Sequence, residues 1–316
     1  MKRGAETQEA VALFLNGLGD HFMTLPAIRA TSAALKGDLT LVCLPGSAEM
    51  FFRELPVRRF VEVTRVEATN GYTFDSSSIL QRIARCDLLL SFNRWFCPAT
   101  ERLLRHWQPS RSIGLFRDFK ESVAFRHDVH ASDLSFRVAQ QIDAALRWDD
   151  FAAPPMINAE VEAQAEEFYS LLPSGMRVLA LHAETGREKQ WKPEYWRALL
   201  DQFLSRNKNF MVLPLGLDPL DLDRCRHRSR IIGAYGAPFH FALASLRRAH
   251  LFLGVDSCML HAADAFGLPS VGLFGPTSAQ EFGFHNTRKY RQFQGNGSLD
   301  GIMPRAVLGA LEELIA

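Results

Sequence analysis

The stretch LFLGVDSCMLHAADAFGLPSVGLFGPT, residues 251–277, contains two apolar runs that each end in a short turn. The first run, 251–255, is followed by the polar turn 256–258 and then by an apolar helical pattern, and the second, 270–274, by Gly-Pro-Thr. Continuous apolar runs separated by a helical pattern are typical of parallel strands buried on both faces. The stretch therefore predicts a strand–helix–strand unit of a doubly wound α/β fold.

The turn between the first strand and its helix is a candidate phosphate site. It places free backbone N–H groups and the positive end of a helix dipole at the carboxyl end of a strand. Ser257 can cap the helix or donate to a phosphate, Asp256 can cap or orient, and His261 lies one turn later on the same helix face. Alone, this pattern favours a capped helix with a core histidine. Because Thr277 follows the next strand at the same sheet edge, we favour phosphate binding.

The same alternation of apolar runs and helical patterns fills both halves of the chain. In the first half we expect strands at 11–15, 39–44, 59–63 and 87–92, and a helix that has Pro26 near its start. After the proline-containing segment 148–158, the second half has predicted strands at 178–182 and 210–215 and predicted helices at 193–206 and 304–315.

Two domains follow from this restart and from a length of 316 residues. We predict two doubly wound, Rossmann-like domains, 1–152 and 153–316, that face each other across a cleft. Whether the last helix packs back on the first domain stays open at this point.

Composition excludes several classes of protein. With 47% hydrophobic residues, 22% charged residues and a net charge of +1, nothing points to a nucleic-acid partner. The five cysteines are scattered, which argues against a disulfide framework or a zinc site. No run approaches the roughly 18 apolar residues of a membrane span, and the run 11–15 is too short for a signal segment. We expect a cytoplasmic protein with at most peripheral contact with the inner face of the membrane.

The segment HAETGREKQWKPEYW, residues 182–196, follows a predicted strand and contains candidate diphosphate ligands. Lys189 and Lys192 are the candidate cations, and Thr185 is a candidate hydroxyl donor. A solvated surface charge is the usual role of a single lysine. Trp191 can pack this loop onto its helix and hold a neighbouring lysine in place.

The turn NGLGD, residues 16–20, is neither a GxGxxG fingerprint nor a phosphate loop. Asp20 stands at a predicted helix start, where it either caps the helix or acts as a general base on an attacking hydroxyl. His21 is a weaker candidate for the same role.

Other candidates are less specific. A basic stretch between 102 and 126, which includes Arg117 and Lys120, can hold an anionic acceptor or form a salt-bridged surface. Asp218 and Asp221 follow a predicted strand, where a carboxylate binds a ribose hydroxyl or is simply solvated.

Taken together, these motifs resemble glycosyltransferase family 9, the family of ADP-heptose:lipopolysaccharide heptosyltransferases. The resemblance rests on NGLGDHFMTLPAIR at 16–29, KQWKPEYW at 189–196 and GVDSCMLHAADAFGLPSVGLFGPT at 254–277. It implies a GT-B fold and inverting transfer without a metal or other cofactor, from a nucleoside-diphosphate sugar, with an ADP-sugar favoured. It further implies that Asp20 is the general base. The implied donor contacts are Thr185, Lys189, Asp256, Ser257, Cys258 through its backbone, and His261.

The expected function is transfer of a sugar such as heptose to a hydroxyl of a glycan, glycolipid or other acceptor, in lipopolysaccharide or surface-glycan synthesis. The alternatives are a GT-B enzyme acting on a small molecule or protein, and an inactive nucleotide-binding relative. The chain departs from the family pattern at Cys258, where glycine is usual, and at Lys192, where proline is common.

Overall fold

The computed structural model describes residues 9–69 and 71–316. The chain divides into two compact units, Met1–Met156 and Ile157–Ala316. The division falls inside the proline-containing segment 148–158. In each unit, helices cover a six-stranded sheet.

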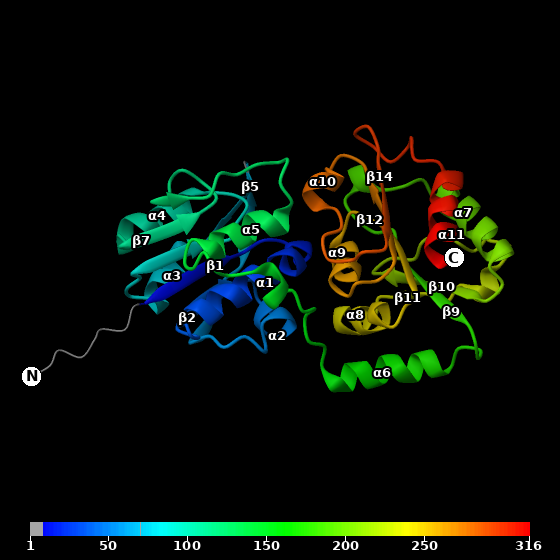
Figure 1. The fold of residues 1–316 in the computed structure, drawn as a ribbon, viewed down its shortest axis with the longest axis horizontal. Coiled ribbons are helices and arrows are strands. Elements are labelled where there is room, and N and C mark those ends of the chain that lie inside the picture. The colour runs from blue at the N-terminus through cyan, green and yellow to red at the C-terminus, as the bar shows by residue number, and fades with distance from the viewer. Residues whose placement is uncertain (1–8, 70) are drawn as a thin grey trace, which may run out of the picture. The chain divides into compact units, whose positions relative to one another are not determined.

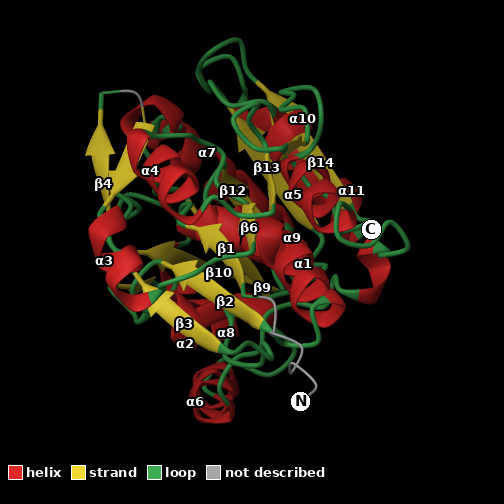
Figure 2. Cartoon of the chain, turned by 90° about the vertical axis from the view of Figure 1, so that its left-hand side faces the viewer, coloured by secondary structure: helices red, strands yellow, loops and turns green. Residues whose placement is uncertain are grey.

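The sheet of the N-terminal unit is parallel throughout, in the order β3-β2-β1-β6-β7-β8. Its strands are β1 (Ala10–Phe14), β2 (Leu39–Cys43), β3 (Arg59–Glu62), β6 (Leu88–Ser91), β7 (Arg111–Gly114) and β8 (Glu121–Ser122). An antiparallel hairpin, β4 (Arg65–Ala68) and β5 (Gly71–Phe74), stands apart from this sheet (Figure 2). This hairpin was not predicted from the sequence.

Two helix pairs pack together in the N-terminal unit. The first pair is α1 (Leu18–Ala34) with α5 (Ala131–Gln140), and the second is α3 (Ser76–Arg82) with α4 (Pro98–Trp107). A short helix, α2 (Ser47–Phe51), follows β2. All five residues of β1 are buried, as expected for a central parallel strand.

Pro26 lies inside α1, not near its start as predicted. The helix begins at Leu18, where the Asp20 carboxylate accepts a hydrogen bond from the backbone N–H of Gly17 at the N-cap. This contact is one half of a capping box and stabilises the first turn. The predicted helix start at Asp20 therefore agrees with the structure to within two residues, and only the placement of Pro26 near that start was wrong.

The C-terminal unit repeats this topology, with the parallel order β11-β10-β9-β12-β13-β14. Its strands are β9 (Arg177–His182), β10 (Phe210–Gly216), β11 (Ala234–Tyr235), β12 (Leu251–Val255), β13 (Ser270–Phe274) and β14 (Tyr290–Gln294). Its helices are α6 (Ala159–Ser170), α7 (Pro193–Arg206), α8 (Phe239–Arg247), α9 (Cys258–Ala265), α10 (Ala279–Phe282) and α11 (Pro304–Ile315).

The helices of this unit cover both faces of the sheet. Figure 1 shows α7 and α11 on one side and α8 and α9 on the other. The last helix, α11, packs against α7 and β13 of its own unit. The core on the α7 side is apolar and includes Trp196, Phe203 and Leu311.

A buried carboxylate on α9 holds the segment that leads into β14. Asp264 accepts hydrogen bonds from the backbone N–H groups of His285, Asn286 and Thr287 at 2.9–3.1 Å and from the Asn286 side chain at 3.0 Å. A carboxylate satisfied by several N–H groups is stable when buried, so this contact ties the loop to the helix.

Numbered along the chain within each unit, the strands of both sheets have the order 3-2-1-4-5-6. Strands 1 to 3 are added towards one edge of the sheet and strands 4 to 6 towards the other, so the order of addition reverses once. The reversal lies between β1 and β6 in the N-terminal unit and between β9 and β12 in the C-terminal unit. In open α/β sheets, ligands bind outside the carboxyl ends of the strands at this switch point. Asp20 follows β1, Thr185 follows β9 and Asp256 follows β12.

Candidate functional site

Asp256 is the centre of a polar cluster at the switch point of the C-terminal sheet. Its carboxylate lies 2.8 Å from Nζ of Lys189 and 3.4 Å from Nε2 of His261. The Thr185 hydroxyl donates to the Asp256 carbonyl oxygen at 3.1 Å. The register that pairs β9 with β12 brings these residues together from two loops and one helix. Four of the predicted donor contacts therefore lie in one cluster.

The contacts of Asp256 with His261 and Lys189 determine its ionisation state. Burial alone raises the pKa of Asp256, but the hydrogen bond and charge of His261 and the ammonium of Lys189 outweigh it and hold the pKa below its usual range. Asp256 is thus an anion at neutral pH, and it fixes a cation beside the first turn of α9.

Two buried hydroxyls at the same sheet edge have no hydrogen-bond partner among the described residues. They are Ser257 Oγ, at the end of β12, and Thr277 Oγ1, at the end of β13. Ser257 occupies the N-cap position of α9, but its side chain makes no capping hydrogen bond. A buried hydroxyl without a partner costs free energy, so this edge is chemically suited to a ligand with several acceptor oxygens.

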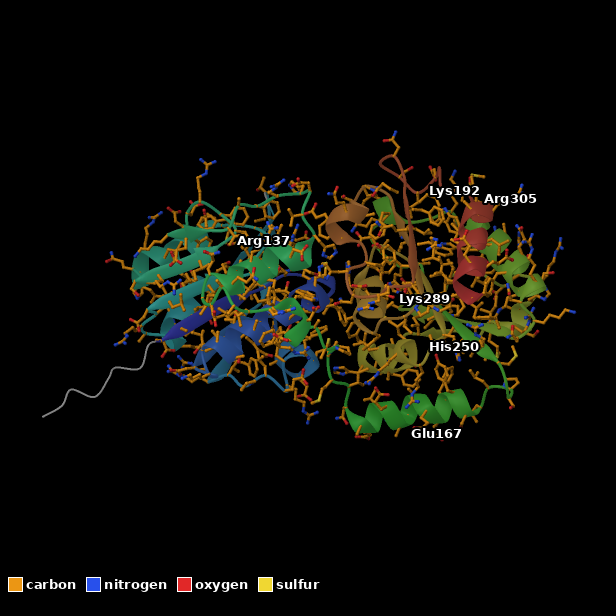
Figure 3. All side chains as sticks on the ribbon, in the orientation of Figure 1. Arg137, Glu167, Lys192, His250, Lys289 and Arg305 are labelled. Carbon is orange, nitrogen blue, oxygen red and sulfur yellow. The ribbon has the colours of Figure 1, made fainter. Side chains whose placement is uncertain are left out.

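The loop that contains Lys189 is anchored from its C-terminal side. Trp191 is buried, and its Nε1 donates to the Ile302 carbonyl at 3.0 Å. Lys192 Nζ lies 3.3 Å from Asp300, next to the start of α11 (Figure 3). Of the two lysines that the sequence offered as diphosphate cations, only Lys189 contacts the Asp256 cluster.

A pocket of about 190 Å³ lies at the carboxyl ends of β9 and β10. Its lining includes Ala183, Glu184, Trp191, Asp218, Leu220 and Tyr235. Apolar walls with a few polar groups are typical of small-molecule sites. The pocket adjoins the Asp256 cluster through the loop 183–191.

The two candidate ribose contacts differ in their surroundings. Asp218 lines this pocket. Asp221 does not line it; its carboxylate lies 3.1 Å from Arg197 and is 64% exposed. Asp221 is thus a solvent-exposed partner of Arg197, and its role as a ribose contact stays a prediction.

Cys258 is the first residue of α9 and lies beside Ser257. Burial raises the pKa of its thiol to about 11, so Cys258 is a neutral thiol at physiological pH. A position at a helix N-terminus therefore does not make this cysteine a thiolate nucleophile.

In the N-terminal unit, His21 is not available as a base. Its Nδ1 lies 2.8 Å from the Gly17 carbonyl and its Nε2 lies 2.9 Å from Ser47 Oγ. Burial lowers the pKa of His21 to about 4, and its ring packs against Phe51 and Phe14. The imidazole is a neutral core group, which leaves Asp20 as the candidate base of this turn.

Two asparagines join the strand ends at the N-terminal switch point. Asn93 Oδ1 accepts from the Leu15 backbone N–H at 2.7 Å, and Asn16 Nδ2 donates to the Phe92 carbonyl at 2.9 Å. The sequence analysis singled out neither residue for this role. The two asparagines are far apart in the chain, and they come into contact because β1 pairs with β6.

Arg65 of the hairpin was also missed by the sequence analysis. Its Nη1 donates to the Leu15 carbonyl at 2.8 Å, and its guanidinium lies 4.0 Å from the centre of the Tyr72 ring. Asp20 and Arg65 both lie next to Gly17. If Gly17 had a Cβ atom, it would lie 3.5 Å from Asp20 Oδ2 and 3.7 Å from Arg65 Nη2. Arg65 thus adds positive charge to the surroundings of Asp20.

The two predicted acceptor contacts, Arg117 and Lys120, have different surroundings. Lys120 Nζ donates to the carbonyls of Pro109 and Ser110, at 2.6 and 3.4 Å, which is a structural role. Arg117 is exposed. Several other arginines of the basic stretch are paired with nearby carboxylates, such as Arg111 with Glu121.

Over the described part of the chain, no helix is both long enough and apolar enough to cross a membrane. Over the same residues, no group of three or more His, Cys, Asp or Glu side chains is arranged to hold a metal ion. The cytoplasmic location stays a prediction.

The family model for glycosyltransferase family 9 (heptosyltransferase) matches residues 103–297. The chain belongs to this family. The matched region includes the whole Asp256 cluster and the turn that contains Thr277. The protein is therefore a glycosyltransferase.

Solved structures are similar to almost the whole chain. The family 9 glycosyl transferase of Veillonella parvula is 20% identical, with a TM-score of 0.75 over 98% of this chain and 97% of that chain. The ADP-heptose lps heptosyltransferase II of E. coli is 14% identical, with a TM-score of 0.68 over 97% and 98%. The E. coli heptosyltransferase WaaC with ADP is 17% identical, with a TM-score of 0.66 over 96% and 99%.

These likenesses establish the GT-B fold that the sequence predicted. No curated protein matches the chain.

Proposed function

We propose that this protein is an inverting, metal-independent glycosyltransferase that moves a sugar, heptose in the first instance, from an ADP-sugar to an acceptor hydroxyl in lipopolysaccharide or surface-glycan synthesis. The observation that carries the proposal is the Asp256 cluster. In it, Lys189 and His261 lie beside the turn that contains the Ser257 hydroxyl, which has no hydrogen-bond partner within residues 9–69 and 71–316. Hydroxyl, ammonium and backbone N–H groups are the donors that a diphosphate requires.

In the proposed reaction, the acceptor oxygen attacks the anomeric carbon as the bond from that carbon to the diphosphate oxygen breaks. Asp20 takes the proton of the acceptor hydroxyl, and the nucleoside diphosphate leaves with the bonding electrons. Lys189, His261, Ser257 and Thr277 stabilise the charge that develops on the leaving group. This donor set offers an ammonium and several hydrogen-bond donors to the leaving diphosphate, which supports the metal-independent scheme.

The pocket lined by Asp218 and Tyr235 is the proposed site of the nucleoside. Its carboxylates can accept from ribose hydroxyls, and its apolar walls suit a base. ADP is the first nucleotide to test because WaaC, which is similar in fold, is a heptosyltransferase solved with ADP.

A thermal-shift screen with ADP, GDP, UDP and dTDP and their sugars tests the donor. A ligand that binds only the folded state stabilises it by about 2.7 kcal/mol at a hundredfold excess over Kd. We expect ADP and its sugars to raise the unfolding midpoint most. If no nucleotide raises it, the donor site is wrongly assigned.

The role of Asp20 is tested by Asp20→Asn with ADP-heptose as donor and a lipopolysaccharide core oligosaccharide as acceptor. We expect transfer to fall by about 10²- to 10⁴-fold, the usual contribution of a general base, with ADP affinity unchanged. Asp75→Asn is the matched control, because Asp75 caps α3 in the same unit and has no proposed chemical role. Equal effects of the two variants on transfer would make Asp20 a capping residue. If the wild-type protein binds ADP but transfers no sugar to the acceptor, the protein is an inactive relative.

A further inference from the structure

Gln294, the last residue of β14, makes an unusual number of contacts with the turn that follows β13. Its Oε1 accepts from the Ala279 backbone N–H at 2.8 Å. Its Nε2 lies 2.9 Å from the Gly275 carbonyl, 3.1 Å from that of Thr277 and 3.2 Å from that of Gly295. Because Nε2 carries two hydrogens, it donates to two of these three carbonyls at a time.

The carboxamide is chemically matched to this position. It faces carbonyl oxygens on one side, which need a donor, and a backbone N–H on the other, which needs an acceptor. Among side chains of this length, a carboxylate has no hydrogen to donate at neutral pH, and an aliphatic chain has neither function. Gln294 therefore clamps the turn 275–279 from the neighbouring strand.

The clamped turn contains Thr277, whose Oγ1 is buried without a hydrogen-bond partner among the described residues. Hydrogen bonds to a ligand require donor–acceptor distances near 2.7–3.0 Å, so the hydroxyl is useful only while the turn is held in place. Ser278 caps α10 through its own side chain, and the Gln294 carboxamide crosses from β14 to the carbonyls of Gly275 and Thr277.

We propose that Gln294 is a positioning residue for the donor: it sets the place of the turn 275–279 and thereby aims the Thr277 hydroxyl at the diphosphate. The proposal rests on the proposed function, because it takes Thr277 as a donor contact. It adds a residue on β14, a strand that lies two strands from β12 in the sheet order, and this residue acts on the ligand only through the turn.

The direct test is the affinity for ADP, measured by titration calorimetry, of Gln294→Leu and Gln294→Met. Both variants are neutral, so they add no charge near the diphosphate. We expect Kd for ADP to rise about tenfold, which corresponds to the loss of about one net hydrogen bond. Gln292→Leu is the matched control: both glutamines are exposed on the same strand, but the Gln292 side chain lies near Gly283, beyond the turn 275–279, and we expect its Kd to equal that of the wild type.

A double-mutant cycle separates positioning from general loss of structure. If Gln294 acts through Thr277, the variant Thr277→Val/Gln294→Leu binds ADP no more weakly than Thr277→Val alone. Additive losses, or wild-type affinity in both Gln294 variants, would overturn the positioning role while leaving the donor site intact. Failure of the wild-type protein to bind any nucleoside diphosphate would instead overturn the proposed function, and the role of Gln294 with it.

Discussion

Lys189 Nζ lies 2.8 Å from Asp256 Oδ2, so the cation proposed for the diphosphate is already held by a buried carboxylate. The Asp256 side chain is 6% exposed and that of Lys189 25% exposed. An ammonium has three hydrogens, and one contact with Asp256 leaves two for a ligand. Asp256 therefore orients Lys189 without using up its capacity to bind phosphate oxygens.

Replacing Lys189 should weaken nucleotide binding directly. We expect Lys189→Met to raise Kd for ADP by about 10- to 100-fold, because hydrogen bonds to charged groups contribute about 1.5–3 kcal/mol. Calorimetric titration with ADP measures the change. Lys192→Met is the matched control on the same loop, since Lys192 pairs with Asp300. If both variants bind ADP as the wild type does, Lys189 is not a diphosphate ligand.

The neutral, buried state of His21 predicts a pH-dependent stability. Its folded-state pKa is about 4, below the ordinary value of 6.5, so the unfolded chain takes up a proton before the folded chain does. The contribution of His21 is complete above pH 6.5 and is lost as the pH falls towards 4. Between pH 7 and pH 5, we expect the free energy of unfolding of the wild type to fall about 2 kcal/mol more than that of His21→Gln.

Urea titrations of both proteins at the two pH values measure this difference. The comparison uses the change with pH and not the absolute stability, so the packing lost in His21→Gln cancels. Parallel pH dependence in the two proteins would mean that His21 titrates normally in the folded state.

The fold could be predicted from the sequence because its signals are local. The helices at 193–206 and 304–315 each begin with a proline and were predicted with the bounds that the structure has. The hairpin of β4 and β5 was missed because half of its strand residues are exposed and they form no apolar run. Pro26 was expected near the start of its helix because proline is common in a first turn, but it lies eight residues after Leu18.

The site was predictable as a set of residues but not as an arrangement. The sequence supplied Lys189, Asp256 and His261 through their positions after predicted strands, and the structure brings them together. Their roles stay predictions. Arg65 and Gln294 could not be found in this way. Their contacts with Leu15 and Gly275 span 50 and 19 residues of the chain, and their neighbours in sequence carry no recognisable motif.

The half-buried thiol of Cys258 should react slowly. With a pKa of about 11, its thiolate fraction at pH 7.5 is about two orders of magnitude below that of an ordinary cysteine. We expect iodoacetamide to modify Cys258 correspondingly more slowly than it modifies glutathione, as measured by peptide mass spectrometry. The rate should rise as the pH approaches 10. Rapid modification at neutral pH would show that the helix N-terminus activates the thiol after all.

The hydrogen bonds of the Asp264 carboxylate should contribute to the stability of the folded protein. Asp264→Asn replaces one acceptor oxygen with an N–H₂ group that faces the backbone N–H groups of the segment 285–287. Leaving such buried groups unsatisfied costs about 1–3 kcal/mol, so we expect the free energy of unfolding to fall by about that amount. Urea unfolding of Asp264→Asn measures the loss, with Asp223→Asn as control because the Asp223 side chain is 90% exposed. Equal stability of the two variants would mean that the loop before β14 does not depend on α9.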